Sequence, residues 1–434
     1  MNELCTKGAG ELAGMIASGA VSSSEVTEAH LALIEEVNPD LNAVTATLAD
    51  EAREAAAAVD RCVAAGEQVG ALAGVPFTVK ENIDVAGSAT TWGVVAFAEQ
   101  IAPTDAPTVA RLREAGAIPL ARTNLPDFAF RWHTESGRAG HTHNPWDANR
   151  TPGGSSGGEA VALATGMTPL GLGNDFGGSL RVPSQMCGTA ALRPSRGRVA
   201  EGNATEPRVH PISIQLTMSA GPMARRVADL RLALAILSAP DARDPRWVPA
   251  PLDGPAIDDP VRVAVVRDPL GDGIDPQVRA GVDRAAGWLA DAGYHVVDAE
   301  PPQIAEATEA WVEVMFADAG VTWPLMEPVA GTGLREFIEA CFASGVGKPV
   351  DQAAQLAAWE AVHTIGAAWT AFLQEHPIVL SPVCCERPWI VGEDINRGDE
   401  IAGAMRVVVQ VNVLGLPACA VPVGSDERLP QGVH

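Results

Sequence analysis

The chain has 434 residues, of which 47% are hydrophobic and 19% are charged, so it can bury a large core and wholesale disorder is not expected. Its formal net charge of −24, from 30 basic and 54 acidic residues, argues against nucleic-acid partners because it repels phosphate backbones. No apolar run reaches 18 residues, and no basic start precedes an apolar stretch, so we expect a cytoplasmic protein without a membrane partner.

The first 65 residues are predicted to be mainly helical. Ser22 and Glu25 form a capping box, and the apolar residues that follow keep the spacing of one helix face. The alanine-rich residues 50–65 extend this helical character. Next comes GVPFTVKEN (residues 74–82), a predicted strand whose apolar side chains alternate onto one face and leave Thr78 and Lys80 on the other.

Helices and apolar strands alternate along the rest of the chain. Residues 109–123 predict a helix, a glycine turn and a strand, and residues 275–300 repeat this pattern after a cap at Asp275. Residues 227–237 predict an amphipathic helix, residues 262–268 a buried strand, and residues 411–423 a buried strand and turn. This alternation indicates an α/β fold with a substantial sheet.

We interpret residues 1–434 as one domain without internal repeats. Its parts are an N-terminal helical region (1–65), a core that carries the motifs described below (66–237), and the remaining sheet and helices with a variable region (238–434).

Residues 151–181 hold two glycine-rich runs, TPGGSSGG and FGGS, around an apolar segment. A flexible linker would not pass straight into AVALATGMTPLGLG, which predicts a short helix and a buried strand. A phosphate loop would need a lysine in the pattern GxxxxGK[ST], and none follows. Because glycine lets the backbone approach a substrate and aim N–H groups at one point, FGGS (residues 176–179) is a candidate oxyanion hole.

Each run also contains a serine that could act as a nucleophile, Ser155 or Ser179. A serine hydroxyl needs a base, and no histidine lies between residues 143 and 210. Lys80 could serve if burial lowers its pKa from about 10.4 toward neutrality. Taken singly, the glycines are equally explained as tight turns and the lysine as a surface residue at a strand end.

No metal or cofactor site is predicted. His133, His141 and His143 share one loop but lack regular ligand spacing. The seven cysteines show no CxxC pattern and suit reduced thiols. We interpret the adjacent Cys384 and Cys385 as buried small hydrophobic residues rather than a redox pair.

Three segments together resemble the amidase signature family: GVPFTVKENID, TPGGSSGG and GLGNDFGGSLRVPSQMCGTAALRPSRGRV. The resemblance covers nearly the whole chain. It implies an α/β fold with a large twisted mixed β-sheet flanked by α-helices on both sides. It further implies a cofactor-free amidase that cleaves C–N bonds of small amides through an acyl-enzyme, with aryl amides, esters and carbamates (urethanes) as related substrates.

The resemblance also implies a role for each matching residue. Ser179 would be the nucleophile, and Ser155, after a cis peptide bond, would relay its proton to Lys80. The backbone N–H groups of Phe176, Gly177, Gly178 and Ser179 would form the oxyanion hole. Four residues would support the site: Ser156 by a hydrogen bond near Lys80, Asn174 in place of the family's usual threonine or serine, Asp175 and Arg181 by holding the nucleophile loop.

Substrate choice is expected to depend on loops between the motifs, because such loops usually set specificity. Aromatic residues in two variable segments are candidates for an apolar, aryl-accepting pocket, although ordinary core positions would explain them as well. These residues are Phe130, Trp132, Trp311, Phe316 and Trp323.

Alternative functions stay open at this point. One is the glutaminase component of a tRNA-dependent amidotransferase, which the acidic composition disfavours. Another is an α/β-hydrolase, since GGSSG and GSSGG fit GxSxG and a later histidine could serve as base, namely His210, His295, His363 or His376. A non-catalytic binding module and a homodimer are also open. The family pattern normally continues beyond LPQGVH, so we expect a trimmed C-terminus.

Overall fold

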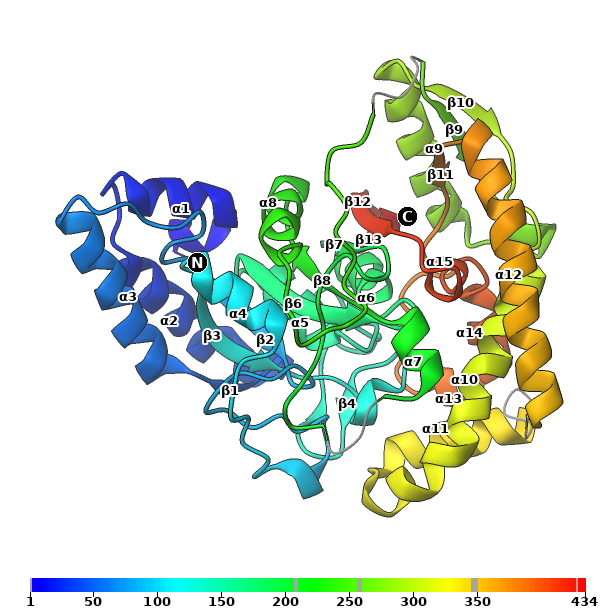
Figure 1. Cartoon of the computed structure of the whole chain (residues 1–434), viewed down its shortest axis with the longest axis horizontal. Helices are drawn as coiled ribbons and strands as arrows, with labels where there is room; N and C mark the ends of the chain where they lie inside the picture. Colours follow the sequence, from blue (N-terminus) through cyan, green and yellow to red (C-terminus); the bar gives the residue numbers. More distant parts are fainter. Residues whose placement is uncertain (1, 207–209, 256–259, 345–349, 427) are drawn as a thin grey trace.

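The computed structural model describes residues 2–206, 210–255, 260–344, 350–426 and 428–434 (Figure 1). Eight strands form a mixed sheet in which β2 pairs in parallel with β3 and β6, and the other neighbours are antiparallel. In spatial order the strands are β1 (Val44–Thr47), β3 (Ile118–Thr123), β2 (Pro76–Lys80), β6 (Leu170–Asp175), β8 (Ser219–Ala224), β7 (Ala190–Arg193), β12 (Ala418–Asp426) and β13 (Leu429–Val433).

Helices cover both faces of this sheet, as the resemblance implies. The apolar side chains of β2, including Phe77 and Val79, pack with one set of helices: α1 (Ala9–Ala17), α4 (Pro107–Glu114) and α8 (Val227–Leu237). Side chains from the opposite face, such as Leu120 and Met223, pack with another set: α3 (Ala49–Ala64), α5 (Gly157–Thr165) and α6 (Arg181–Cys187). Because both faces are covered, all five residues of β2 are buried.

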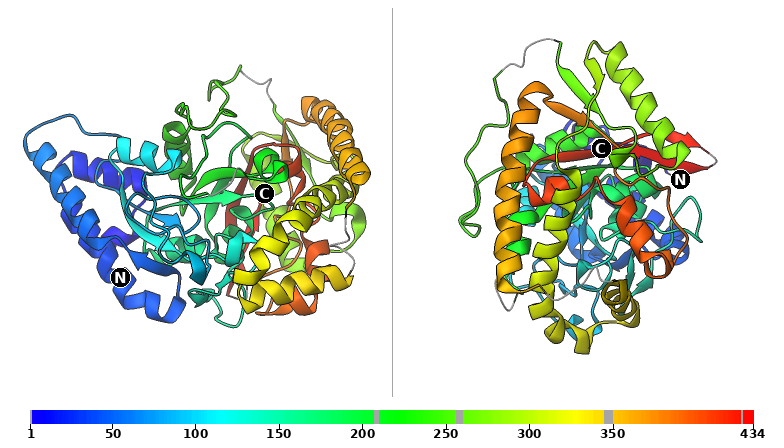
Figure 2. Two further views of the ribbon diagram at one scale, coloured as in Figure 1. Left: turned by 60° about the horizontal axis from the view of Figure 1, so that its bottom comes forward. Right: turned by 90° about the vertical axis from the view of Figure 1, so that its right-hand side faces the viewer.

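The N-terminal helices gather at one end of the sheet (Figures 1 and 2). Here α2 (Ser23–Leu41) begins with the predicted capping box: the Ser22 hydroxyl accepts from Glu25 N at 3.1 Å, and the Glu25 carboxylate accepts from Ser22 N at 2.8 Å. These bonds satisfy amide groups that the first helical turn leaves without partners.

A second group of helices lies at the other end of the molecule (Figure 2). Its long members are α10 (Ile304–Met326), α11 (Thr332–Ser344) and α12 (Gln352–Glu375), and its short members are α7 (Ile212–Thr217), α13 (Glu393–Asn396), α14 (Gly398–Ala404) and α15 (Gln410–Val413). Several of them share a core with α6 that contains Met186, Trp311 and Val408. No helix within the described ranges is long and apolar enough to cross a membrane.

Two smaller sheets complete the described structure. The parallel strands β10 (His295–Asp298), β9 (Arg262–Val265) and β11 (Ile378–Leu380) pack with α9 (Pro276–Asp291), and the strands β4 (Glu135–Ser136) and β5 (Gly140–His141) form a hairpin. The predicted helices at 227–237 and 275–291 are both present, and the adjacent Cys384 and Cys385 are buried as expected.

One predicted element is wrong in part. Residues 411–423 do not start as a strand, because α15 continues to Val413 and β12 begins only at Ala418. The helical turn is closed by local bonds, such as the one from Leu414 N to Gln410 O at 3.0 Å. The four residues of α15, QVNV, are too few for their periodicity to separate a helical turn from a strand.

Candidate active site

Lys80 occupies the last position of β2 and is completely buried. Its Nζ atom lies 2.7 Å from Oγ of Ser155 and 2.9 Å from Oδ1 of Asn174. Burial lowers the pKa of Lys80 to about 7, although the negative charges of Asp175 and Glu159 act in the opposite direction. A large share of the amine is therefore neutral near pH 7 and has a lone pair that can accept a proton.

Ser155 belongs to a loop that neighbouring side chains hold from several directions. The Thr134 hydroxyl donates to Gly153 O at 2.8 Å and accepts from Gly157 N at 3.1 Å. The peptide bond between Gly154 and Ser155 is cis, the isomer that the resemblance implies. This arrangement keeps the Ser155 hydroxyl buried and directed at Lys80.

Ser179 lies on the loop that links β6 to α6. The backbone of this loop touches the other serine loop, because Ser156 N donates to Ser179 O at 3.1 Å. Within the described residues, no hydrogen bond joins the hydroxyls of Ser155 and Ser179. The structure thus brings Lys80 and Ser155 into direct contact and places Ser179 on an adjoining loop, where its side chain lines a cavity.

Asp175 and Arg181 hold the two ends of the Ser179 loop together. The Asp175 carboxylate accepts from Gly178 N at 2.7 Å, from Leu180 N at 3.2 Å and from the Arg181 guanidinium at 2.9 and 3.0 Å. Asn412 donates to the same carboxylate at 2.8 Å. Burial alone would raise the pKa of Asp175, but the charge and hydrogen bonds of Arg181, the charge of Arg193 and the hydrogen bond from Asn412 together keep the pKa below its usual range.

This contact changes the expected oxyanion hole. The Gly178 N–H already donates to Asp175, so it is not available to a substrate oxygen. The N–H groups of Phe176, Gly177 and Ser179 have no acceptor among the residues that the structure describes. Three of the four predicted donors are therefore open to a ligand.

The expected role of Ser156 is wrong. Its hydroxyl makes no hydrogen bond to Lys80 and is buried without any partner in the described chain. A Cβ atom on Gly173 would lie 2.8 Å from the Ser156 Oγ, which places the hydroxyl against the backbone of β6. Since Ser156 directly precedes α5, its orientation follows the start of that helix, and Asn174 supplies the second contact to Lys80 instead.

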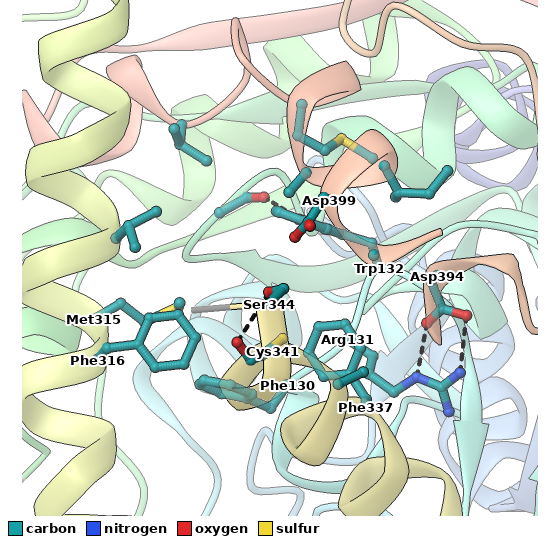
Figure 3. Close-up of a pocket in the computed structure, with 18 of the residues that line it drawn as sticks. Phe130, Arg131, Trp132, Met315, Phe316, Phe337, Cys341, Ser344, Asp394 and Asp399 are labelled. Carbon is teal, nitrogen blue, oxygen red and sulfur yellow. Dashed lines mark hydrogen bonds and ion pairs between the residues drawn. The ribbon is translucent and has the colours of Figure 1, made fainter. Parts of the chain in front are cut away.

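Ser179, Phe176 and Gly177 line a cavity of about 370 Å³. Four of the five predicted aromatic pocket residues also line it, namely Phe130, Trp132, Trp311 and Phe316. Figure 3 shows Phe130 and Phe316 around this space, together with Phe337 and Met315, which sequence reasoning missed. The cavity is therefore walled mainly by aromatic and other apolar side chains.

Trp323 is the exception among the predicted pocket residues. It lies on α10 about two turns beyond Phe316 and packs near Leu334 and Ile338 of α11 instead of lining the cavity. The prediction failed here because the sequence places aromatic residues in a variable segment but does not show which of them a second helix will cover.

The charged groups beside the cavity are largely paired. Arg131 donates to Asp394 at 2.9 and 3.0 Å in a buried two-bond contact (Figure 3). It also donates to Glu135 at 3.0 Å. Asp399 lies exposed at the wall and has no ion pair within the described ranges. Among the lining residues that the structure describes, Arg131 is the one cation, and its pairing leaves no free cation for an anionic substrate.

Glu159 is a buried group near the site that sequence reasoning missed. Its carboxylate accepts from the hydroxyls of Thr78 at 2.5 Å and Thr123 at 2.8 Å. Burial raises the pKa of Glu159 to about 7. The signal in the sequence that could have revealed it is that Glu159 is the one acidic residue of the apolar helix GGEAVALAT. This helix covers the side of β2 that also carries Lys80.

Among the described residues, no histidine lines the cavity, and Cys341 is the one cysteine that does. The rings of His133 and His141 approach to 3.0 Å between Nε2 and Nδ1, yet in the described part of the chain no group of three ligand-type residues could hold a metal ion. None of the four histidines considered as a hydrolase base lines the cavity beside Ser179. Burial raises the pKa of Cys385 to about 12, which opposes thiolate chemistry.

Comparisons with known proteins identify the family of this chain. Residues 25–434 match the family model described as Amidase. The chain is 39% identical over 430 residues to the indoleacetamide hydrolase of Bradyrhizobium diazoefficiens, covering 98% of this chain and 82% of that protein. It is 36% identical over 352 residues to the indoleacetamide hydrolase of Bradyrhizobium japonicum, covering 79% of this chain and 74% of that protein.

Solved structures are similar over nearly their full length. A bacterial aryl acylamidase of the amidase signature family superposes with a TM-score of 0.82 at 27% identity, covering 98% of this chain and 91% of that one. The 6-aminohexanoate cyclic dimer hydrolase superposes with a TM-score of 0.83 at 26% identity, covering 100% of this chain and 93% of that one. The chain therefore belongs to the amidase signature family and is a hydrolase of amides.

Proposed function

We propose that this amidase hydrolyses small amides with an aromatic acyl group, using Ser179 as nucleophile, Ser155 as proton relay and Lys80 as base. The observation that carries the proposal is the 2.7 Å contact between Nζ of Lys80 and Oγ of Ser155, beside the cavity that Ser179 lines. A buried lysine whose pKa is near 7 can take a proton at neutral pH.

Acylation begins when the proton of Ser179 moves to Ser155 as the Ser155 proton moves to Lys80. Oγ of Ser179 then bonds to the carbonyl carbon, and the oxygen that becomes negative accepts from the open N–H groups of Phe176, Gly177 and Ser179. The proton on Lys80 returns through Ser155 to the leaving nitrogen as the C–N bond breaks. Water then attacks the acyl-enzyme by the same route, and Ser179 is restored.

The acyl specificity follows from the cavity. Aromatic walls from Phe130, Trp132, Trp311 and Phe316 favour a flat apolar group, and Arg131 is already neutralised by Asp394. Arylacetamides are the first choice of substrate, since a 39% identical relative is named indoleacetamide hydrolase. Anilides, aryl esters and carbamates can enter the same acyl-enzyme route, but we place them second.

The test is a substrate panel with the purified chain. Indole-3-acetamide, phenylacetamide, an anilide, an aryl ester, a carbamate and glutamine are compared by product release, and Ser179→Ala is the matched control. We expect arylacetamides to show the highest kcat/KM, with an acyl adduct found on Ser179 by mass spectrometry. Preferred turnover of glutamine would support the glutaminase alternative, and turnover that survives Ser179→Ala would overturn the proposed nucleophile.

A further inference from the structure

Two indole rings at the cavity wall donate hydrogen bonds to carbonyl groups of the Ser179 loop. Nε1 of Trp132 donates to Gly177 O at 2.7 Å, and Nε1 of Trp311 donates to Phe176 O at 3.2 Å. In a trans peptide the C=O and N–H groups point in opposite directions. The partner of each carbonyl therefore decides where the next N–H group is aimed.

The peptide between Gly177 and Gly178 is held at both ends. Trp132 binds its carbonyl oxygen, and the Asp175 carboxylate binds its N–H group at 2.7 Å. The peptide between Phe176 and Gly177 is held at one end only. Its carbonyl faces Trp311, and its N–H group has no acceptor in the described structure. The bond from Trp311 thus turns the Gly177 N–H away from the ring and leaves it open.

The Ser179 loop packs directly against the indole rings of Trp132 and Trp311. Trp132 and Trp311 stack with centroids 6.3 Å apart and planes at 21°, and the Phe176 ring lies 5.6 Å from Trp311. A Cβ atom on Gly177 would come within 2.5 Å of Cζ2 of Trp311. Only glycine permits this close approach, and glycine peptides rotate easily, so the loop depends on outside groups for its orientation.

We propose that Trp311 is a positioning residue that orients the Phe176–Gly177 peptide of the oxyanion hole through its indole N–H group, in addition to forming the cavity wall. The inference rests on the proposed function, because the open N–H groups matter only if an oxyanion forms beside Ser179. A hydrogen bond that fixes a donor for the transition state acts on kcat, whereas an aromatic wall acts mainly on KM.

The variants Trp132→Phe and Trp311→Phe remove the N–H group and keep an aromatic side chain. For Trp311→Phe we expect kcat to fall about 10- to 100-fold while KM changes less than about threefold, since losing an oxyanion donor outright costs about 100- to 1,000-fold. Trp132→Phe should lower kcat less than Trp311→Phe does, because Asp175 still holds the N–H group of the peptide that Trp132 binds. Equal kcat in Trp311→Phe and the wild type, or a change confined to KM, would overturn the positioning role.

Trp369→Phe is the matched control. Trp369 belongs to the same core cluster as Trp311, does not line the cavity, and its Nε1 atom has no hydrogen-bond partner in the described chain. This variant is expected to keep the kcat and KM of the wild type. A loss of kcat equal to that of Trp311→Phe would mean that any tryptophan truncation in this core disturbs the site, and it would overturn the inference.

Two further measurements separate this inference from the proposed function. A fluorophosphonate forms a P–O bond with a reactive serine and releases fluoride, so its rate of labelling at Ser179 needs no natural substrate. We expect wild type to be labelled and Trp311→Phe to be labelled at least about tenfold more slowly. Unlabelled and inactive wild type would overturn the proposed function, whereas labelled wild type with equally fast labelling of Trp311→Phe would overturn the positioning role alone.

A crystal structure of Trp311→Phe gives a readout that is independent of activity. We expect the Phe176–Gly177 peptide to rotate, so that its carbonyl leaves the direction of residue 311. An unchanged peptide orientation in well-defined density would overturn the inference even if the variant were slow.

Discussion

The side-chain oxygen of Asn174 lies 2.9 Å from Nζ of Lys80. An amide oxygen is only an acceptor, so it must take a hydrogen from the amine. A neutral lysine has two N–H groups and one lone pair. When one hydrogen points at Asn174, the lone pair can face the hydroxyl of Ser155 at 2.7 Å. Asn174 therefore orients the base as well as packing beside it.

The pH dependence of the reaction should reflect this amine. The pKa of Lys80 is lowered to about 7 by burial, and only the neutral form can accept a proton. We predict that kcat/KM is low below pH 6, rises through a midpoint near pH 7 and then levels off. A profile that is flat between pH 5.5 and 8.5 would contradict the assignment of Lys80 as base.

Asn174→Asp should move this midpoint to higher pH. The substitution keeps the size of the side chain and places a negative charge beside the amine, which favours its protonated form. We predict an upward shift of about one pH unit or more in the kcat/KM profile. Asn174→Thr, which restores the family's usual residue, serves as the control and should leave the midpoint nearly unchanged.

Glu159→Gln should act in the opposite direction. The Glu159 charge favours protonation of Lys80, and glutamine removes that charge while retaining groups that can bond to Thr78 and Thr123. We expect the midpoint to fall below that of the wild type, as measured by the same kcat/KM profile. A shift in the same direction as Asn174→Asp would be inconsistent with this electrostatic role.

The aromatic cavity can be tested with two substitutions on one helix. Phe316→Ala removes a cavity wall and should raise KM for arylacetamides about tenfold, because roughly 1.5–3 kcal/mol accompanies burial of such a side chain. Trp323→Ala, which truncates an aromatic residue outside the cavity, should leave KM within about twofold of the wild type. Steady-state kinetics on phenylacetamide measure KM for both variants. Equal increases in KM for Phe316→Ala and Trp323→Ala would contradict the assignment of the cavity as the acyl pocket.

The pair of Arg131 and Asp394 should contribute to stability. Both side chains are almost fully buried, so Asp394→Leu leaves a guanidinium whose remaining ion-pair partner in the described chain is Glu135. We predict a loss of about 3–5 kcal/mol in the free energy of unfolding, measured with urea. The double variant Arg131→Met/Asp394→Leu should recover part of this loss. No recovery would show that packing, and not the unpaired charge, causes the effect.

Local patterns in the sequence were sufficient for many elements. The helix spacing of residues 227–237 and the cap at Asp275 predicted α8 and α9, since both signals depend on neighbours within a few residues. The motifs around Lys80 and Ser155 predicted the contact between these two side chains, because the segments resemble a known family.

Contacts between distant segments could not be predicted from local sequence patterns. Asn412 binds the carboxylate of Asp175 across 237 positions, and Arg131 binds Asp394 across 263 positions. Neither pair is marked by local spacing. The same holds for Gly178, whose N–H group was expected in the oxyanion hole but donates to Asp175 once the loop closes on it. The direction of the Ser156 side chain could not be predicted either, because it depends on how the chain enters α5.

The most direct test of the mechanism compares how fast a fluorophosphonate labels Ser179 in wild type and in Lys80→Met, which replaces the amine with an apolar side chain of similar length. We predict a single adduct on Ser179 in wild type at pH 8 and a labelling rate lower by about 10³-fold in Lys80→Met. An adduct on a different residue, or equal labelling rates in the two proteins, would contradict a serine nucleophile that is activated by Lys80 through Ser155.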